Sequence, residues 1–161
     1  DSSPIIYAGS SQKQATWDGL GDATEHAMKI IHRLGKAQGD PNRPVIYRPK
    51  PSWQDAIPIE ATTFSRPPQR IEDILPGAWC LVTQVSNAAV DALIFGVPVI
   101  VLGSGIARPV GNLNEADVVD PRFPSDEERL RWCHDLAYCQ WTLGELRSGE
   151  AWRDLRGILL S

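Results

Sequence analysis

Apolar residues gather in short unbroken runs that alternate with amphipathic stretches. Four runs have the length of buried strands, and they cover residues 5–8, 45–47, 79–83 and 99–102. Strands that are apolar throughout are typical of a parallel sheet covered by helices on both faces. A further apolar run, 57–61, contains Pro58, which has no N–H for a sheet ladder, so this run is predicted to be a short edge strand.

Helical patterns lie between and after these runs. Asp22 and Glu25 form a capping-box pattern that begins an amphipathic helix. Shorter helices are predicted over 69–75 and 87–95, and Gly96 suits the left-handed position just past the end of the second.

After an irregular segment rich in Gly, Pro, Asn and Asp, two C-terminal helices are predicted. The first begins at a capping box at Ser125, and the second covers about residues 149–159. The whole alternation predicts an α/β fold, a Rossmann-like three-layer α/β/α arrangement with a parallel sheet of about five strands. With 161 residues, we expect a single α/β domain over 1–161, of which 124–161 is the C-terminal helical segment.

Polar residues follow the strand over 79–83, where a helix begins. Ser86 and Asn87 stand where free helical N–H groups would face the carboxyl edge of the sheet, which is a natural site for a phosphate. The alternative is that both residues merely cap the helix. Asp91 lies about one turn further along. Its carboxylate needs donors or a place at a rim, and the alternative is a solvated helix face.

Two cations stand just after the strand over 45–47. Arg48 and Lys50 are separated by Pro49 and followed by Pro51, so both are presented from a stiff turn. Cations held in this way can stabilise the charge of a departing phosphate without a metal. The alternative is a pair of surface basic residues beside a turn.

Two glycine-containing loops complete the candidate site. The loop after the first strand contains Ser10, Ser11 and Lys13, which could hold a phosphate or a donor sugar, although it lacks the P-loop and dinucleotide fingerprints. The loop after the last strand contains Arg108, which could reach a phosphate or a sugar acid. A plain connection is the alternative for each loop.

Several segments resemble a known family. Residues 91–99, Asp-Ala-Leu-Ile-Phe-Gly-Val-Pro-Val, resemble the acidic-Ala-Leu-x-x-Gly-x-Pro-Val signature in the donor-binding half of GT-B glycosyltransferases. Residues 45–52 are similar to the strand and Arg-Pro-His-Pro segment of the capsular-polysaccharide, Kdo-transferase-like branch, with Lys50 in place of the usual His. Residues 83–87, Thr-x-x-Ser-Asn, also resemble that branch and related phage-encoded proteins, whose C-terminal tail is similar to residues 136–152.

This resemblance implies the nucleotide-sugar-binding domain of a metal-independent glycosyltransferase, with the nucleotide sugar as substrate and no cofactor. Ser86 and Asn87 would hold phosphate, Asp91 would bind the ribose, and Arg48 and Lys50 would stabilise the leaving group. The family usually has Glu where this chain has Asp91. A GT-B enzyme has two α/β domains facing each other across a cleft. A second domain or a partner chain would therefore form the other wall and supply the general base.

Two alternatives stay open. A non-catalytic α/β module for nucleotide binding or assembly would explain why Lys50 and Asp91 depart from the family pattern. A nucleotide-sugar epimerase on the same fold would convert the donor without an acceptor.

The composition of the chain argues against several classes of binding partner. The net charge of −4 and pI of about 5.3 argue against a nucleic-acid surface, except for a modified base as acceptor. No apolar run is long enough to span a membrane. The three cysteines and three histidines have neither metal-ligand spacing nor a disulfide framework, and no signal peptide is visible, so a cytoplasmic protein without a metal site is predicted. Because the chain begins at Asp1, we expect a processed or excised piece of a longer protein.

Overall fold

The structure, a computed structural model, describes residues 3–159. The chain divides into two compact units, Asp1–Ser125 and Asp126–Ser161. The division lies close to residue 124, where the C-terminal helical segment is predicted to begin. That the two units form a single domain stays a prediction.

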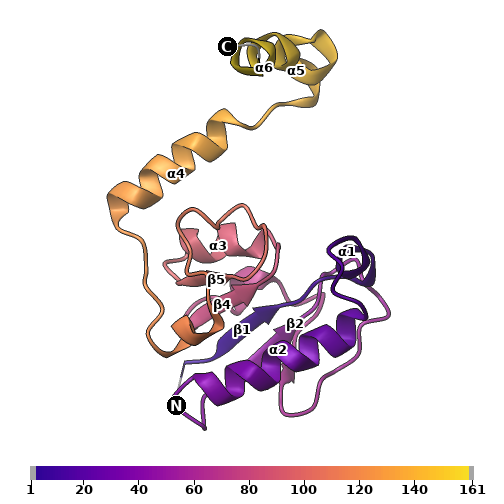
Figure 1. Ribbon diagram of the computed structural model, residues 1–161, viewed down its shortest axis with the longest axis vertical. Coiled ribbons are helices and arrows are strands. Elements are labelled where there is room, and N and C mark those ends of the chain that lie inside the picture. Colours follow the sequence, from indigo (N-terminus) through magenta and orange to yellow (C-terminus); the bar gives the residue numbers. More distant parts are fainter. Residues whose placement is uncertain (1–2, 160–161) are drawn as a thin grey trace. The chain divides into compact units, whose positions relative to one another are not determined.

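The first unit is built on one parallel sheet of five strands (Figure 1). The strands are β1 Ile5–Ala8, β2 Val45–Arg48, β3 Thr63–Phe64, β4 Cys80–Thr83 and β5 Val99–Val101. Their order across the sheet is β3-β2-β1-β4-β5, so β1 and β4 are neighbours although they are far apart in the sequence. The strand order reverses at this pair, which is the topological switch point of a doubly wound sheet. The predicted Rossmann-like fold class is confirmed.

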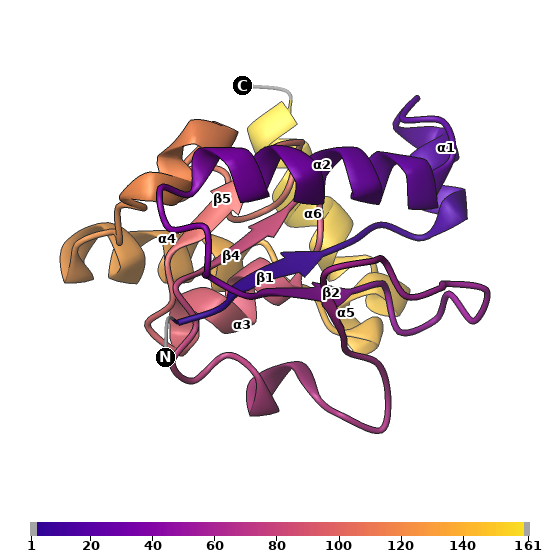
Figure 2. The ribbon, with the colours of Figure 1, turned by 90° about the horizontal axis from the view of Figure 1, so that it is seen from below.

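Helices cover both faces of this sheet, with α2 on one side and α3 on the other (Figures 1 and 2). The helical elements of this unit are α1 Gln12–Trp17, α2 Ala23–Ala37, α3 Ala88–Ile94 and the short 3-10 helices η1 Ile71–Asp73 and η2 Glu115–Val119. As predicted, Asp22 caps α2, since its Oδ1 accepts a hydrogen bond from the N–H of Glu25 at 2.9 Å. Gly96 follows α3 with a φ of 78°, in the left-handed region.

One hydrophobic core cluster combines α2 with residues of the sheet. Ile30 and Leu34 of α2 are buried in one cluster with Ile5, Tyr7 and Tyr47 of the strands. Removing each such side chain from water stabilises the fold by about 1.5–3 kcal/mol. This packing holds α2 against the central strands.

The strands end level with one another at their carboxyl ends. Ala8 of β1 pairs with Arg48 of β2 and Thr83 of β4, and Thr83 pairs in turn with Val101 of β5. The loops that follow these four residues therefore leave the sheet at the same edge.

The predicted edge strand over 57–61 is wrong, because the edge strand is β3, slightly later in the chain. The segment instead turns at Ala61, whose φ of 58° is incompatible with an extended strand. Ile59 within it is buried, which explains the apolar pattern without a strand. The short elements α1 and η2 were not predicted either, because elements of five or six residues show too little periodicity.

The second unit is helical. It contains α4 Asp126–Tyr138, α5 Leu143–Ser148 and α6 Glu150–Leu159, one helix more than predicted. Gly149, with a φ of 76°, separates α5 from α6. Thr142 caps α5 and forms a capping box with Glu145. Across residues 3–159, no helix is both long enough and apolar enough to cross a membrane.

Candidate functional site

A pocket of about 370 Å³ lies beyond the carboxyl ends of β1, β2 and β4. Its lining residues are Gly9, Ser10, Gln14, Lys50, Pro51, Val85, Ser86 and Asn87. They belong to α1 and to the segments that directly follow the three strands. A pocket at the switch point between β1 and β4 is where open α/β sheets hold their ligands, and its volume suits a small molecule. We call it the carboxyl-edge pocket.

The structure brings several of the predicted site residues together in this pocket. Ser10, Lys50, Ser86 and Asn87 all line it, although they come from three separate segments. Their predicted roles toward a ligand stay predictions. Their juxtaposition is a feature of the fold.

Thr83, the buried last residue of β4, fixes the position of Ser86. The Thr83 hydroxyl donates to the carbonyl oxygen of Ala8 at 2.9 Å and accepts from the N–H of Ser86 at 3.1 Å. The Ser86 hydroxyl in turn accepts from the N–H of Ala88 at 3.2 Å, so Ser86 caps the start of α3. Asn87 makes no side-chain capping bond, and its exposed amide lines the pocket.

Lys50 gives the carboxyl-edge pocket its charge. No other charged residue among residues 3–159 is part of the lining. The Lys50 side chain is exposed, and it forms no ion pair with any residue in the range 3–159. A lone ammonium group in a hollow attracts anions, because low-dielectric walls focus its field.

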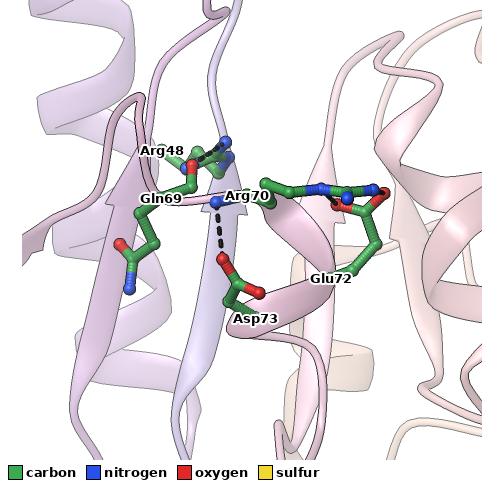
Figure 3. A network of polar contacts seen from close by, with 5 residues as sticks. All are labelled: Arg48, Gln69, Arg70, Glu72 and Asp73. Carbon is green, nitrogen blue, oxygen red and sulfur yellow. Dashed lines mark hydrogen bonds and ion pairs between the residues drawn. The ribbon is translucent and has the colours of Figure 1, made fainter.

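Arg48 has a different environment from Lys50. Its side chain is only 7% exposed and is not part of the pocket lining. Nη1 donates to the Ser65 hydroxyl at 2.7 Å. Nη2 donates to the carbonyl oxygen of Gln69 at 2.8 Å (Figure 3). Burial lowers the pKa of Arg48, while the nearby carboxylates of Glu72 and Asp73 act in the opposite direction. The guanidinium thus ties the end of β2 to the loop after β3.

Asp91 lies in the first turn of α3, half-buried and outside the lining of the pocket. Burial raises the pKa of Asp91, and the negative charge of Glu72 raises it further. Glu72 itself pairs with Arg70 at 2.6 Å (Figure 3). The structure therefore places Asp91 near η1, and its predicted contact with a ribose stays a prediction.

The remaining predicted residues also lie outside the pocket lining. Ser11 caps α1, since its hydroxyl accepts from the N–H of Gln14 at 3.3 Å. Lys13 is exposed in the first turn of α1. Arg108 is exposed, and its Nη1 donates to the carbonyl oxygen of Gly103 at 2.9 Å.

Gly103 is required by packing within the chain. A Cβ at this position would lie 2.8 Å from the carbonyl oxygen of Gln84. The space beside Gly103 is therefore taken up by the segment that follows β4.

Sequence reasoning missed one polar pair at this edge. His26, in the first turns of α2, lies with its Nε2 at 2.9 Å from Nε2 of the buried Gln84. The amide N–H donates to the ring nitrogen, which requires a neutral imidazole at that position. Burial lowers the pKa of His26, and the positive charges of Arg33 and Lys29 lower it further. The residues are 58 positions apart, so only the capping box before His26 pointed to its place at this edge.

This pair predicts a pH-dependent stability. Because the pKa of folded His26 lies below its ordinary value of 6.5, the unfolded chain binds the proton more readily. The contribution of neutral His26 to the free energy of unfolding is therefore fully present above pH 6.5. It is lost as the pH falls through the pKa of His26 in the folded protein. We expect urea denaturation between about pH 5 and pH 8 to show this loss. The loss of stability at low pH should be absent in His26→Gln. It should be retained in His32→Gln, which changes an exposed histidine of the same helix. An identical pH profile for wild type and His26→Gln would contradict the assignment.

Comparison with known proteins shows which solved structures have a similar fold. No protein-family model matches the chain, and no curated protein matches its sequence. Among solved structures, it is similar to the spinosyn rhamnosyltransferase SpnG complexed with spinosyn aglycone, with a TM-score of 0.52 and 10% identity over 93% of this chain and 46% of that one. The chain shares its fold with one part of SpnG. The KpsC beta-Kdo 2,4 transferase of Thermosulfurimonas dismutans is also similar, with a TM-score of 0.49 and 11% identity over 73% of this chain and 43% of that one. The chain thus spans less than half the length of either structure.

Proposed function

We propose that the chain is the nucleotide-sugar-binding domain of a metal-independent GT-B glycosyltransferase. The observation that carries the proposal is the carboxyl-edge pocket, whose lining combines Lys50 with the polar residues Ser10, Ser86 and Asn87. One cation surrounded by neutral hydrogen-bonding groups suits the phosphates of a nucleotide sugar. The Rossmann-like fold shared with SpnG supports the same location.

Lys50 has the direct electrostatic role in this proposal. When the sugar leaves its nucleotide, negative charge develops on the phosphate, and a preorganised ammonium group stabilises that charge. Ser10, Ser86 and Asn87 hydrogen-bond to phosphate oxygens. Arg48 acts as a positioning residue that holds the turn before Lys50.

The predicted residues outside the pocket lining have secondary roles in the proposal. Asp91 accepts hydrogen bonds from the ribose hydroxyls. Ser11 and Lys13 of the first loop, and Arg108 of the last loop, contact the donor once it is bound.

The acceptor side of the reaction would belong to a second α/β domain or a partner chain. The chain spans 46% of SpnG, and no residue in the carboxyl-edge pocket is an evident general base. We therefore expect donor binding without appreciable transfer by this chain alone. The motif resemblance favours a sugar of the capsular-polysaccharide type.

A binding panel tests the proposal. UDP, GDP, CMP, TDP, ADP and their common sugar conjugates are titrated in calorimetry and thermal-shift measurements. We expect saturable binding of one nucleotide, and Asp91→Ala should weaken it by about tenfold, since hydrogen bonds between the ribose and a charged carboxylate are lost. Asp120→Ala, which removes an exposed aspartate outside the pocket lining, is the control.

Two outcomes would contradict the proposal. If the folded protein binds none of these nucleotides, a non-catalytic module is the better description. If the preferred donor is converted without an acceptor, an epimerase is the better description. Unchanged affinity in Asp91→Ala would exclude the ribose contact alone.

A further inference from the structure

A second pocket, of about 430 Å³, lies near the amino ends of β2 and β3. The last turns of α2, the segment before β2 and the segment before β3 form its walls, and we call it the amino-edge pocket. It shares no lining residue with the carboxyl-edge pocket. Its apolar wall includes Ile31, Val45 and Ile59.

One residue of the lining is a helical glycine. Gly35 lies within α2, where glycine is unfavourable because it loses more backbone entropy than other residues. A Cβ on Gly35 would have no atom within 4 Å. Packing within the chain therefore gives no reason for a glycine here, and its missing side chain adds to the space of the pocket.

Two of the lining residues, Gln38 and Arg43, have buried polar atoms without hydrogen-bond partners among residues 3–159. Gln38 is 6% exposed, and its Oε1 has no hydrogen-bond partner. The buried Nε of Arg43 also has none, although Nη1 of the same side chain donates to the carbonyl oxygen of Ser3 at 3.0 Å. Buried polar atoms are nearly always satisfied, so each exception needs an explanation.

The backbone is also unusual at this pocket. Ala61, another lining residue, has a φ of 58°, in the left-handed region that residues with a side chain rarely adopt. Four lining residues of this one pocket are thus unfavourable for stability, through a glycine in a helix, unpartnered buried polar atoms or a left-handed backbone. They are Gly35, Gln38, Arg43 and Ala61. Such departures are expected where a site is retained for function.

The charges of the lining indicate the class of ligand. Lys36 and Arg43 are cationic and Glu60 is anionic, so positive charge is in excess here although the chain carries −4 overall. Lys36 forms no ion pair within the described chain, residues 3–159. The guanidinium of Arg43 also stacks on the Trp79 ring, with Cζ 4.1 Å from the ring centroid, so Lys36 is the cation without a partner among residues 3–159. An apolar wall beside these two cations is complementary to a molecule with an apolar body and one anionic group.

We propose that the amino-edge pocket binds a small organic anion whose apolar body packs against Ile31, Val45 and Ile59. The carboxylate or phosphate of this anion pairs with Lys36 and Arg43. This site is independent of the carboxyl-edge pocket and of its proposed donor.

The test uses the full chain and simple probes in calorimetry. 4-Phenylbutyrate and phenyl phosphate represent the two anionic groups, and 4-phenylbutanamide is the neutral counterpart of the first. We expect at least one anion to bind saturably, at least about tenfold more tightly than the amide. Lys36→Gln should reduce anion affinity by about tenfold, whereas Lys29→Gln, an exposed lysine of α2 outside the lining, should leave it unchanged.

Gly35→Leu provides the decisive variant. Its side chain enters open space and replaces a poor helix former, so the melting temperature should not fall. Anion binding should nevertheless be lost, because the pocket is filled. Saturation by neither anion up to about 10 mM, equal affinity for the amide, or unchanged binding in Gly35→Leu would overturn the proposal. Lys50→Ala should leave anion binding intact, which separates this test from that of the donor site.

Discussion

Replacing Lys50 by alanine is expected to weaken binding of the preferred nucleotide sugar by about 10- to 100-fold. Lys50 is the charged member of the carboxyl-edge pocket and is free of ion pairs to the rest of residues 3–159. A hydrogen bond to a charged group contributes about 1.5–3 kcal/mol, which corresponds to that loss of affinity. Because Lys50 is exposed, the folded structure should be unaffected.

Calorimetry at two salt concentrations measures this effect. The wild type should lose affinity as salt increases, and the Lys50→Ala protein should respond less, because its principal cation is gone. Lys29→Ala is the matched control, since Lys29 is exposed but lies outside the pocket. If Lys50→Ala binds the nucleotide sugar as tightly as the wild type, the phosphate does not lie at Lys50.

The sheet could be predicted because each central strand contains an unbroken run of at least three apolar residues. Such runs are buried on both faces, and their burial does not depend on which strand lies beside them. The edge strand was misplaced for the same reason, since Ile59 is buried from a loop and mimics a strand residue. Apolar character marks burial, and it separates strand from loop poorly in short segments.

Part of the candidate site could also be predicted. Ser10, Lys50 and Ser86 lie just beyond the ends of parallel strands, and the level register of those strands gathers them at one edge. Their convergence follows from the fold class alone. By contrast, the pairing of His26 with Gln84 depends on a packing angle between α2 and the sheet that no local pattern records.

Arg48 and Lys50 show where sequence reasoning stops. They are two positions apart, and the sequence offered the same role for both. Arg48 is the last residue of β2 and pairs with Ala8 of β1. The hydrogen-bond partners of its side chain, Ser65 and Gln69, are 17 and 21 residues further along the chain. Only the folded chain shows that one cation is buried among hydrogen bonds while the other is exposed at the pocket.

Arg48→Ala should therefore lower the free energy of unfolding by about 2–4 kcal/mol. The variant loses two charge-assisted hydrogen bonds, of 2.7 and 2.8 Å, and leaves a space where a buried side chain lay. Urea denaturation measures the loss. Arg66→Ala is the matched control, because Arg66 is exposed and contacts the Phe64 ring only at 5.9 Å, so its loss should be below about 1 kcal/mol.

The same variant distinguishes positioning from direct contact. If Arg48 acts by holding the turn before Lys50, Arg48→Lys should also be destabilised, because an ammonium group lacks the planar fork that reaches both Ser65 and Gln69. Both variants should then bind nucleotide more weakly than the wild type even where they are fully folded, because the turn that presents Lys50 is no longer held, but the loss should be smaller than in Lys50→Ala. An Arg48→Ala protein as stable as the wild type but unable to bind nucleotide would instead mean that the guanidinium leaves its partners and contacts the donor directly.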